Sequence, residues 1–244
     1  MRHDASLEKQ MLAAIDKWVE QELRPIAQKY DQADEYPTDL VEQMKEMGLF
    51  GATISEAYGG LGLSALTYAR IVSRICEVWM APSGIFNSHL IMASCVERGG
   101  TQAQKEHFLP KFATGELRGG IGLTEPDAGS DLQGIRLAAK KNGNDYILNG
   151  TKMWITNGSD ADVIVVYAKT DPAADSKGIT AFIVEKDFPG FSVGQKLDKL
   201  GMRGSPTAEL IFDNCEVPEA NVMGALNGGV RVLLSGLAYE RAVL

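Results

Sequence analysis

The chain has 244 residues, of which 45% are hydrophobic and 23% are charged, a composition typical of a globular protein with a sizeable core. The formal net charge of -8 at pH 7 argues against nucleic-acid binding, which normally requires a basic surface. No apolar run approaches the roughly 20 residues that a helix needs to cross a bilayer, so no membrane segment is expected.

Cysteine and histidine are sparse and scattered. No C-x-x-C pair is present, and the histidine spacing does not match a metal site. We therefore expect reduced thiols, no metal, and structural or surface roles for Cys76, Cys95, Cys215, His3, His89 and His107. The N-terminus leads into an amphipathic pattern without a secretory signal, which fits a cytoplasmic bacterial protein or a mature mitochondrial-matrix form.

The first half of the sequence has a helical pattern. Apolar residues recur at helical spacing from Leu7, and Pro25 is expected to kink or end that helix. Thr38 is expected to cap a short helix that Gly48 closes. Further helices are predicted over residues 64–78 and 84–97, and from 101 to 112, where Thr101 and Gln104 match a capping box.

From Gly119 onward the pattern changes to short β-rich runs. Turn signals occur at 142–143, 149–150, 157–158 and 189–190, and buried strands are predicted at 163–167, 179–184 and 208–212. A final helix is predicted over 230–244. These patterns predict an α+β multidomain protein: an all-α N-terminal domain (1–118), an antiparallel β-sandwich or barrel (119–226), and the start of a C-terminal helical bundle (227–244).

Two short motifs indicate a ligand site. LTEPDAGSD, at residues 123–131, combines a turn with hydroxyl side chains, and so offers N–H groups and hydroxyls to phosphates or ring edges. WITNG, at residues 154–158, places a tryptophan two residues from a threonine hydroxyl. Chemistry alone predicts a polar, aromatic-walled site. No G-x-G-x-x-G unit is present, so a Rossmann nicotinamide site is not expected.

These two motifs, with YGGLG at 58–62, KLGMRGS at 199–205 and GLAYER at 236–241, resemble the acyl-CoA dehydrogenase family of flavoproteins. They follow the family's order over nearly the whole chain, in a pattern closest to isovaleryl-CoA-type members. Family members are longer, so the resemblance implies N-terminal and middle domains truncated before the C-terminal helical domain. One departure is Arg231, where isovaleryl-type members carry a tyrosine.

The resemblance implies FAD as cofactor. The tryptophan would pack beside the isoalloxazine ring, and the threonine hydroxyl would bond near its reactive nitrogen. The simpler alternatives are an ordinary turn at 126–129 and a tryptophan buried in the core. The implied cofactor-binding residues are Ile121, Leu123, Thr124, Gly129, Ser130, Trp154, Ile155 and Thr156.

Glu240 is the implied catalytic base, which removes the α-proton of a thioester while hydride leaves the β-carbon for flavin. Its backbone N–H is also expected to polarise the thioester carbonyl. The alternative is a solvated helix glutamate that pairs with Arg241, and a solvated loop is the alternative at 176–177. The implied substrate-binding residues are Ser130, Ser176, Lys177, Ala238, Tyr239 and Arg241.

The implied reaction is oxidation of a saturated acyl-CoA to a trans-2-enoyl-CoA, with electrons passing to an electron-transfer flavoprotein. A homotetramer or homodimer is implied, because a neighbouring subunit's C-terminal domain helps to hold FAD. We therefore expect weak FAD retention by these 244 residues alone. Two alternatives stay open: another flavin oxidase or monooxygenase on the same scaffold, and a non-catalytic truncated binding module.

Overall fold

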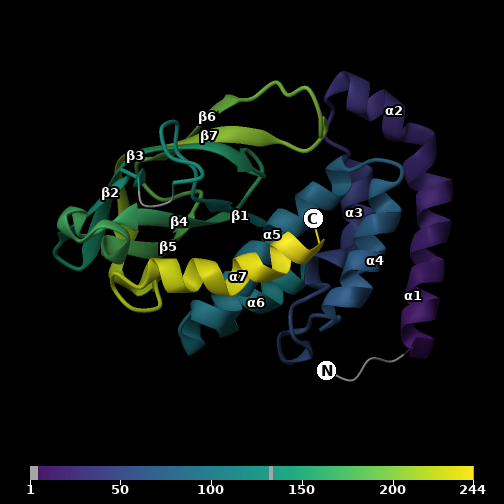
Figure 1. Cartoon of the computed structure of the whole chain (residues 1–244), viewed down its shortest axis with the longest axis horizontal. Coiled ribbons are helices and arrows are strands. Elements are labelled where there is room, and N and C mark those ends of the chain that lie inside the picture. The colour runs from purple at the N-terminus through teal and green to yellow at the C-terminus, as the bar shows by residue number, and fades with distance from the viewer. Residues whose placement is uncertain (1–4, 132–133, 244) are drawn as a thin grey trace.

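The computed structural model describes residues 5–131 and 134–243, with the backbone alone for residues 5, 7 and 237–243. Helices form the first half of the chain, and a β-sheet followed by one helix forms the second, as the sequence predicts (Figure 1). The N-terminal helices are α1 (Ala5–Trp18), α2 (Arg24–Ala33), α3 (Thr38–Glu46), α4 (Ala65–Cys76), α5 (Ala81–Gly99) and α6 (Gln102–Thr114).

The predicted irregularity at Pro25 is confirmed. A π-helical turn, Val19–Leu23, joins α1 to α2, and the N–H of Arg24 bonds to the carbonyl of Val19. Pro25 lies in the first turn of α2, where its missing N–H is tolerated. The long helical run therefore continues past the proline only by widening just before it.

Most helix ends follow the predicted local chemistry. Gly48 adopts a φ of 74° directly after α3, and the side chain of Ser64 caps α4. Thr101 and Gln104 form the predicted capping box on α6. The prediction for Thr38 is wrong: α3 begins at this residue, Pro37 occupies the cap position, and no side chain caps the helix.

Eight strands form one sheet in the order β6-β7-β3-β2-β4-β5-β8, with β1 paired to β4. Most pairs are antiparallel, but β1 and β2 each pair with β4 in parallel. The long connection after β1, which includes the 123–131 segment, lets the chain return in the same direction. The strands are β1 (Gly119–Gly122), β2 (Ala138–Asn142), β3 (Asp145–Thr156), β4 (Val163–Lys169), β5 (Ile179–Glu185), β6 (Phe191–Lys196), β7 (Thr207–Pro218) and β8 (Val222–Met223).

The sheet is buried on both faces around β4. Val163, Val165 and Tyr167 belong to a large apolar cluster shared with the helices. Ile164 and Val166 face a second cluster, which β2, β3, β5 and β7 complete. Because successive side chains point to opposite faces, this continuous apolar strand joins the helical layer to the β-layer.

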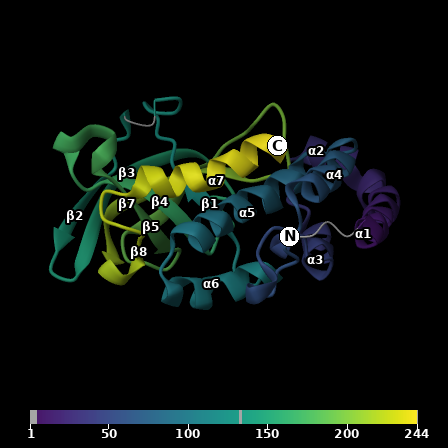
Figure 2. The same cartoon turned by 60° about the horizontal axis from the view of Figure 1, so that its bottom comes forward.

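The last helix, α7 (Gly229–Val243), runs beside α5 along one face of the sheet in both views (Figures 1 and 2). Close packing is possible because Gly99 has no side chain: a Cβ there would lie 3.0 Å from Val232. Val232 and Leu233 are buried in the same cluster as α5. The predicted final helix is thus present up to Val243, residue 244 lies outside the described residues, and the N-terminal half of the helix is packed against the protein.

Candidate functional site

A cavity of about 180 Å³ lies where β1 and β3 meet α5 and α7. The two strands and the segment after β1 contribute six of the eight residues predicted to bind a flavin. Ser88 and Ile91 of α5 and Leu233 of α7 complete the wall, and these three were not predicted from the sequence. The six predicted residues in the wall are Ile121, Leu123, Thr124, Trp154, Ile155 and Thr156.

Trp154 is 59% exposed beside this cavity, so the alternative of a core tryptophan is wrong. Its φ is 64°, and the pairing of β3 with β7 shifts register between Lys152 and Ile155. A positive φ is rare for a bulky residue and indicates local strain maintained by surrounding contacts. The bulge therefore turns the large aromatic ring of Trp154 outward, although Lys152 and Ile155 of the same strand are buried.

Thr124, on the segment after β1, and Thr156, at the end of β3, both line the cavity. Both side chains are half-buried, and neither hydroxyl has a hydrogen-bond partner within the described residues. A hydroxyl can both donate and accept, so each can bond to the polar edge of a bound ring. The exposed ring of Trp154 and the available hydroxyls of Thr124 and Thr156 line the same cavity, and this combination fits a flat heterocycle.

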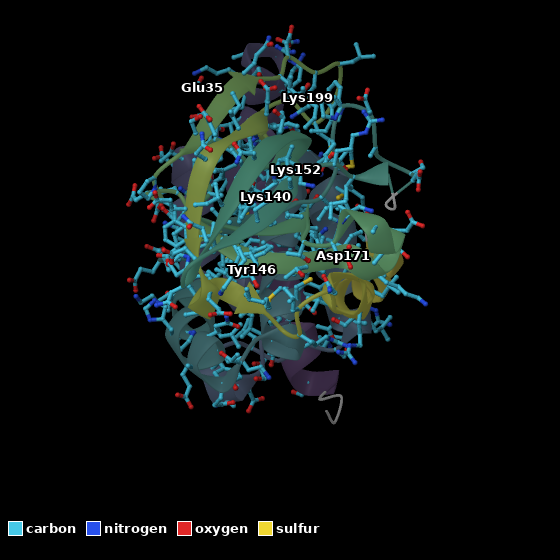
Figure 3. All side chains as sticks on the ribbon, turned by 90° about the vertical axis from the view of Figure 1, so that its left-hand side faces the viewer. Glu35, Lys140, Tyr146, Lys152, Asp171 and Lys199 are labelled. Atoms are coloured by element: carbon cyan, nitrogen blue, oxygen red, sulfur yellow. The ribbon has the colours of Figure 1, made fainter. Side chains whose placement is uncertain are left out.

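The segment after β1 is fixed to β3 by several bonds. The N–H of Met153 donates to the carbonyl of Thr124 at 2.8 Å. The ammonium of Lys152 donates to the carbonyl of Leu123 at 2.9 Å and forms a 2.7 Å ion pair with Glu125. Both charged side chains are buried, and Figure 3 shows Lys152 on its strand within the sheet. Burial lowers the pKa of Lys152 to about 8, although the carboxylate of Glu125 opposes this shift.

Two expected cofactor contacts lie outside the cavity. Glu125 and Ala128 exchange backbone hydrogen bonds of 2.9 and 3.2 Å, which close a tight turn. Gly129 and Ser130 follow this turn and are exposed. The structure therefore separates them from the six residues that share the cavity.

Asn157 is a residue whose role the sequence did not reveal. It is buried, and its carboxamide donates to the carbonyls of Ile85 at 2.8 Å and Gly119 at 3.1 Å. These bonds tie the end of β3 to α5 and to β1. The sequence indicated only a turn at 157–158, because no local pattern shows which distant carbonyls a side chain will meet.

The predicted base and its neighbours, Ala238, Tyr239, Glu240 and Arg241, belong to α7, but their side chains lie outside the described residues. The expectation that the Glu240 N–H polarises a thioester carbonyl stays a prediction, on which the helix places a constraint. Glu240 is inside the helix, where an N–H bonds to the carbonyl four residues earlier. The N–H is therefore already used by the helix.

Ser176 and Lys177 line a second cavity, of about 530 Å³, with Arg231 and Leu234 of α7. This cavity lies beside α7, the helix that carries Glu240. None of the residues predicted to bind the flavin lines it. The sequence-predicted loop and the sequence-predicted helix therefore do lie together.

A third cavity, of about 290 Å³, lies between α4, α5 and α7 and was not predicted. Ile91 lines both this cavity and the cavity of about 180 Å³ that Trp154 borders, so the two are adjacent along α5. In its wall, the hydroxyl of Tyr68 bonds to the Oδ1 of Asn87 at 2.7 Å. Gly236 of α7 contributes the opposite wall.

Among the described residues, no cluster of side chains that could bind a metal ion occurs. His89 is fully buried, and burial lowers its pKa to about 4. Its ring bonds to the carbonyl of Phe112 and to the N–H of Gly119. Nor is any helix of the described residues long and apolar enough for a membrane crossing.

Family models match both halves of the chain. The model of the acyl-CoA dehydrogenase N-terminal domain matches residues 6–116, and that of the middle domain matches residues 120–215. The chain belongs to the acyl-CoA dehydrogenase family. Among curated relatives, mitochondrial isovaleryl-CoA dehydrogenase of Pongo abelii is 47% identical over 242 residues. That alignment covers 97% of this chain but only 57% of the relative's length.

Solved structures of this family show the same fold. Butyryl-CoA dehydrogenase from Megasphaera elsdenii superposes with a TM-score of 0.93 at 34% identity, over 99% of this chain and 64% of that one. The prolyl acyl carrier protein oxidase AnaB superposes with a TM-score of 0.92 at 31% identity, over 99% and 65%. Dehydrogenases and an oxidase therefore share this acyl-CoA dehydrogenase scaffold.

Proposed function

We propose that the protein containing this chain is an FAD-dependent acyl-CoA dehydrogenase that converts a saturated acyl-CoA to a trans-2-enoyl-CoA. The observation that carries this proposal is the shared cavity: six residues matched to the family's flavin contacts line it together. They come from two segments about thirty residues apart in sequence, so their meeting is a property of the fold.

The residues present fit a flavin. Trp154 offers an exposed aromatic face, and Thr124 and Thr156 offer hydroxyls that no described residue occupies. Gly129 and Ser130, on the exposed turn beyond, are available to the more polar part of the cofactor. Bound FAD would supply the hydride acceptor. The protein's own contribution is to hold the ring against the two segments that line the cavity and to keep water from that side of it.

The substrate is proposed to lie along α7. Leu233 lines the flavin cavity, Gly236 lines the cavity between α4, α5 and α7, and position 240 continues this stripe by one further turn. The carboxylate of Glu240 would accept the α-proton. The acyl group would occupy the cavity that Gly236 lines. The CoA portion would lie beside Ser176 and Lys177, near Ala238, Tyr239 and Arg241.

The family resemblance supports three further parts of this proposal. Electrons would pass to an electron-transfer flavoprotein, and the enzyme would act as a homotetramer or homodimer. It would work in the bacterial cytoplasm or, in a eukaryote, in the mitochondrial matrix. The chain covers about three fifths of its relatives' length, so these properties belong to the whole protein.

An anaerobic absorbance titration of the FAD-loaded protein tests the function. Isovaleryl-CoA, butyryl-CoA and a long-chain acyl-CoA would be added separately, and a subset should bleach the flavin band near roughly 450 nm. Glu240→Gln should abolish bleaching while FAD stays bound, because the amide cannot accept the α-proton. A loaded flavin that no acyl-CoA reduces would contradict the dehydrogenase and favour the non-catalytic module.

A second candidate is an oxidase on the same scaffold, and the similarity to AnaB supports it. The two reactions differ in where the electrons go. After reduction by substrate, admission of air should leave a dehydrogenase reduced for much longer than an oxidase. Rapid reoxidation with formation of hydrogen peroxide would favour the oxidase.

A further inference from the structure

The two walls of the proposed flavin cavity come from separate segments. One segment contains Leu123 and Thr124, which follow β1, and the other contains Trp154, Ile155 and Thr156 at the end of β3. The two segments lie side by side, since the N–H of Met153 donates to the carbonyl of Thr124, and each is called a wall of the cavity below. A planar ring bound against both segments requires them to keep a fixed relative position, since a cofactor site tolerates errors of only about half an ångström. The bond from Met153 to Thr124 joins the two backbones, and side-chain contacts add to it.

Lys152 and Glu125 lie at the junction of the walls. Lys152 is the second residue before Trp154, and its Nζ bonds to the carbonyl of Leu123 and to Glu125 Oε1. Glu125 directly follows Thr124. The ammonium group of Lys152 thus contacts the backbone of Leu123 in one wall and the side chain of Glu125, which follows Thr124 of the same wall. The strand that carries Lys152, β3, forms the other wall.

Glu125 is itself held from a third direction. Its Oε2 accepts the N–H of Arg136 at 2.6 Å, and its Oε1 accepts the N–H of Leu137 at 3.0 Å. With both oxygens occupied, the carboxylate has one orientation available to it. The segment just before β2 therefore fixes Glu125, Glu125 orients Lys152, and Lys152 helps to fix the two walls relative to each other.

Stability alone does not account for this arrangement. Lys152 is 0% exposed and Glu125 is 7% exposed, so both charges are removed from water. Desolvation offsets most of the attraction in such a pair, and apolar replacements of buried pairs are often neutral or stabilising. A buried pair contributes more surely to a unique geometry, because its bonds are directional and intolerant of displacement.

We infer that Lys152 and Glu125 are positioning residues whose buried ion pair, together with the backbone bond from Met153 to Thr124, fixes the relative position of the two walls that line the flavin cavity. The inference rests on the proposed function for its ligand. It does not rest on that function for its geometry, because the contacts of Lys152 with Leu123 and Glu125 are made within the chain.

The pH dependence gives the pair a signature of its own. Among the described residues, Glu125 supplies the one charge that acts on the pKa of Lys152, which lies at about 8. Above this pH the amine becomes neutral in the folded state, and the ion pair is lost. Because the unfolded lysine holds its proton to higher pH, unfolding becomes less favourable, not more, between about pH 8 and 10. A positioning role therefore predicts that FAD binding weakens above about pH 8, although the contribution of Lys152 to stability rises over the same range.

The experiment compares Lys152→Met with the wild-type chain. Lys141→Met is the matched control, since Lys141, on β2, forms an exposed ion pair with Glu219. FAD affinity would be measured by titration at pH 7 and pH 9. Acrylamide quenching without cofactor would report the position of Trp154, because Trp18 and Trp79 are buried. A Trp154→Phe background would identify its signal.

We expect Lys152→Met to weaken FAD binding roughly tenfold or more, as loss of a supporting group beside a bound cofactor does. It should also change the quenching of Trp154, while Lys141→Met changes neither. Wild-type affinity should fall from pH 7 to pH 9, and that of Lys152→Met should not. A folded Lys152→Met chain with wild-type affinity and quenching would overturn the inference.

Two further arms keep the result decisive. If Lys152→Met does not fold, Glu125→Gln is measured by the same criteria, because it removes the charge and keeps one acceptor oxygen. If the whole protein that contains this chain binds no FAD, the proposed function fails. The quenching comparison then still decides whether the pair positions Trp154.

Discussion

Single side chains join parts of this protein that are distant in sequence. The carboxamide of Asn157 reaches the carbonyl of Ile85 in α5 and that of Gly119 in β1. It does so from a backbone with a φ of 63°, a conformation that asparagine tolerates better than most residues. The same short stretch of β3 therefore carries Trp154 on its exposed side and a connection to the helices at its end.

Asn157→Ala should lower the free energy of unfolding by about 2–4 kcal/mol, because two carbonyls lose a buried donor and alanine is strained at positive φ. Urea unfolding followed by circular dichroism would measure the change. Asn144→Ala is the control, since Asn144 is exposed in the β2–β3 turn, and its effect should stay within about 0.5 kcal/mol. Equal midpoints for the two variants would contradict the role assigned to Asn157.

Whole elements begin and end where local chemistry allows. The capping box of Thr101 and Gln104 starts α6, and Gly48 ends α3, because each satisfies backbone groups that a helix end leaves unpaired. Gln104 also donates to the carbonyls of Ala220 and Val222. The N-terminus of α6 is thereby tied to the segment that leads into α7.

Thr101→Ala should reduce stability by about 1 kcal/mol, the usual effect of deleting a helix cap. Thermal unfolding would show the loss as a lower melting temperature. Ser73→Ala removes a hydroxyl from the exposed surface of α4 and serves as the comparison. A melting temperature for Thr101→Ala that matches Ser73→Ala would show that the capping bonds contribute nothing.

At the scale of the whole molecule, β4 connects two apolar clusters. All seven of its residues are buried, and its neighbours are β1, β2 and β5. By contrast, β6 lies at an edge of the sheet, and its side chains are exposed or half-buried. The helical layer and the sheet layer should therefore separate only when β4 leaves its place.

Hydrogen exchange measured by mass spectrometry should show the slowest amide exchange in β4, at a rate near that of global unfolding. Peptides from β6 should exchange sooner, because an edge strand can open without exposing either cluster. The β6 peptides provide the internal comparison within one sample. Exchange of β4 as fast as that of β6 would mean that the two layers open independently.

The helical half, the β-rich middle and the final helix could be predicted because they depend on periodicity and on local turn and cap chemistry. The motifs at 123–131 and 154–158 also identified most of one cavity wall. Ser88, Ile91 and Leu233 in that wall could not be predicted, since nothing in α5 or α7 indicates which turn will face β3. The parallel pairing of β1 with β4 was missed for the same reason.

The sequence by itself determined the order of the elements, their ends and the residue types available for chemistry, because those depend on neighbours a few positions away. The tertiary structure alone decided that Trp154 is exposed, that Lys152 is buried against Glu125, and that three cavities lie along α7. Such features depend on contacts between residues tens of positions apart. The packing of the whole chain, which no local pattern specifies, fixes those contacts.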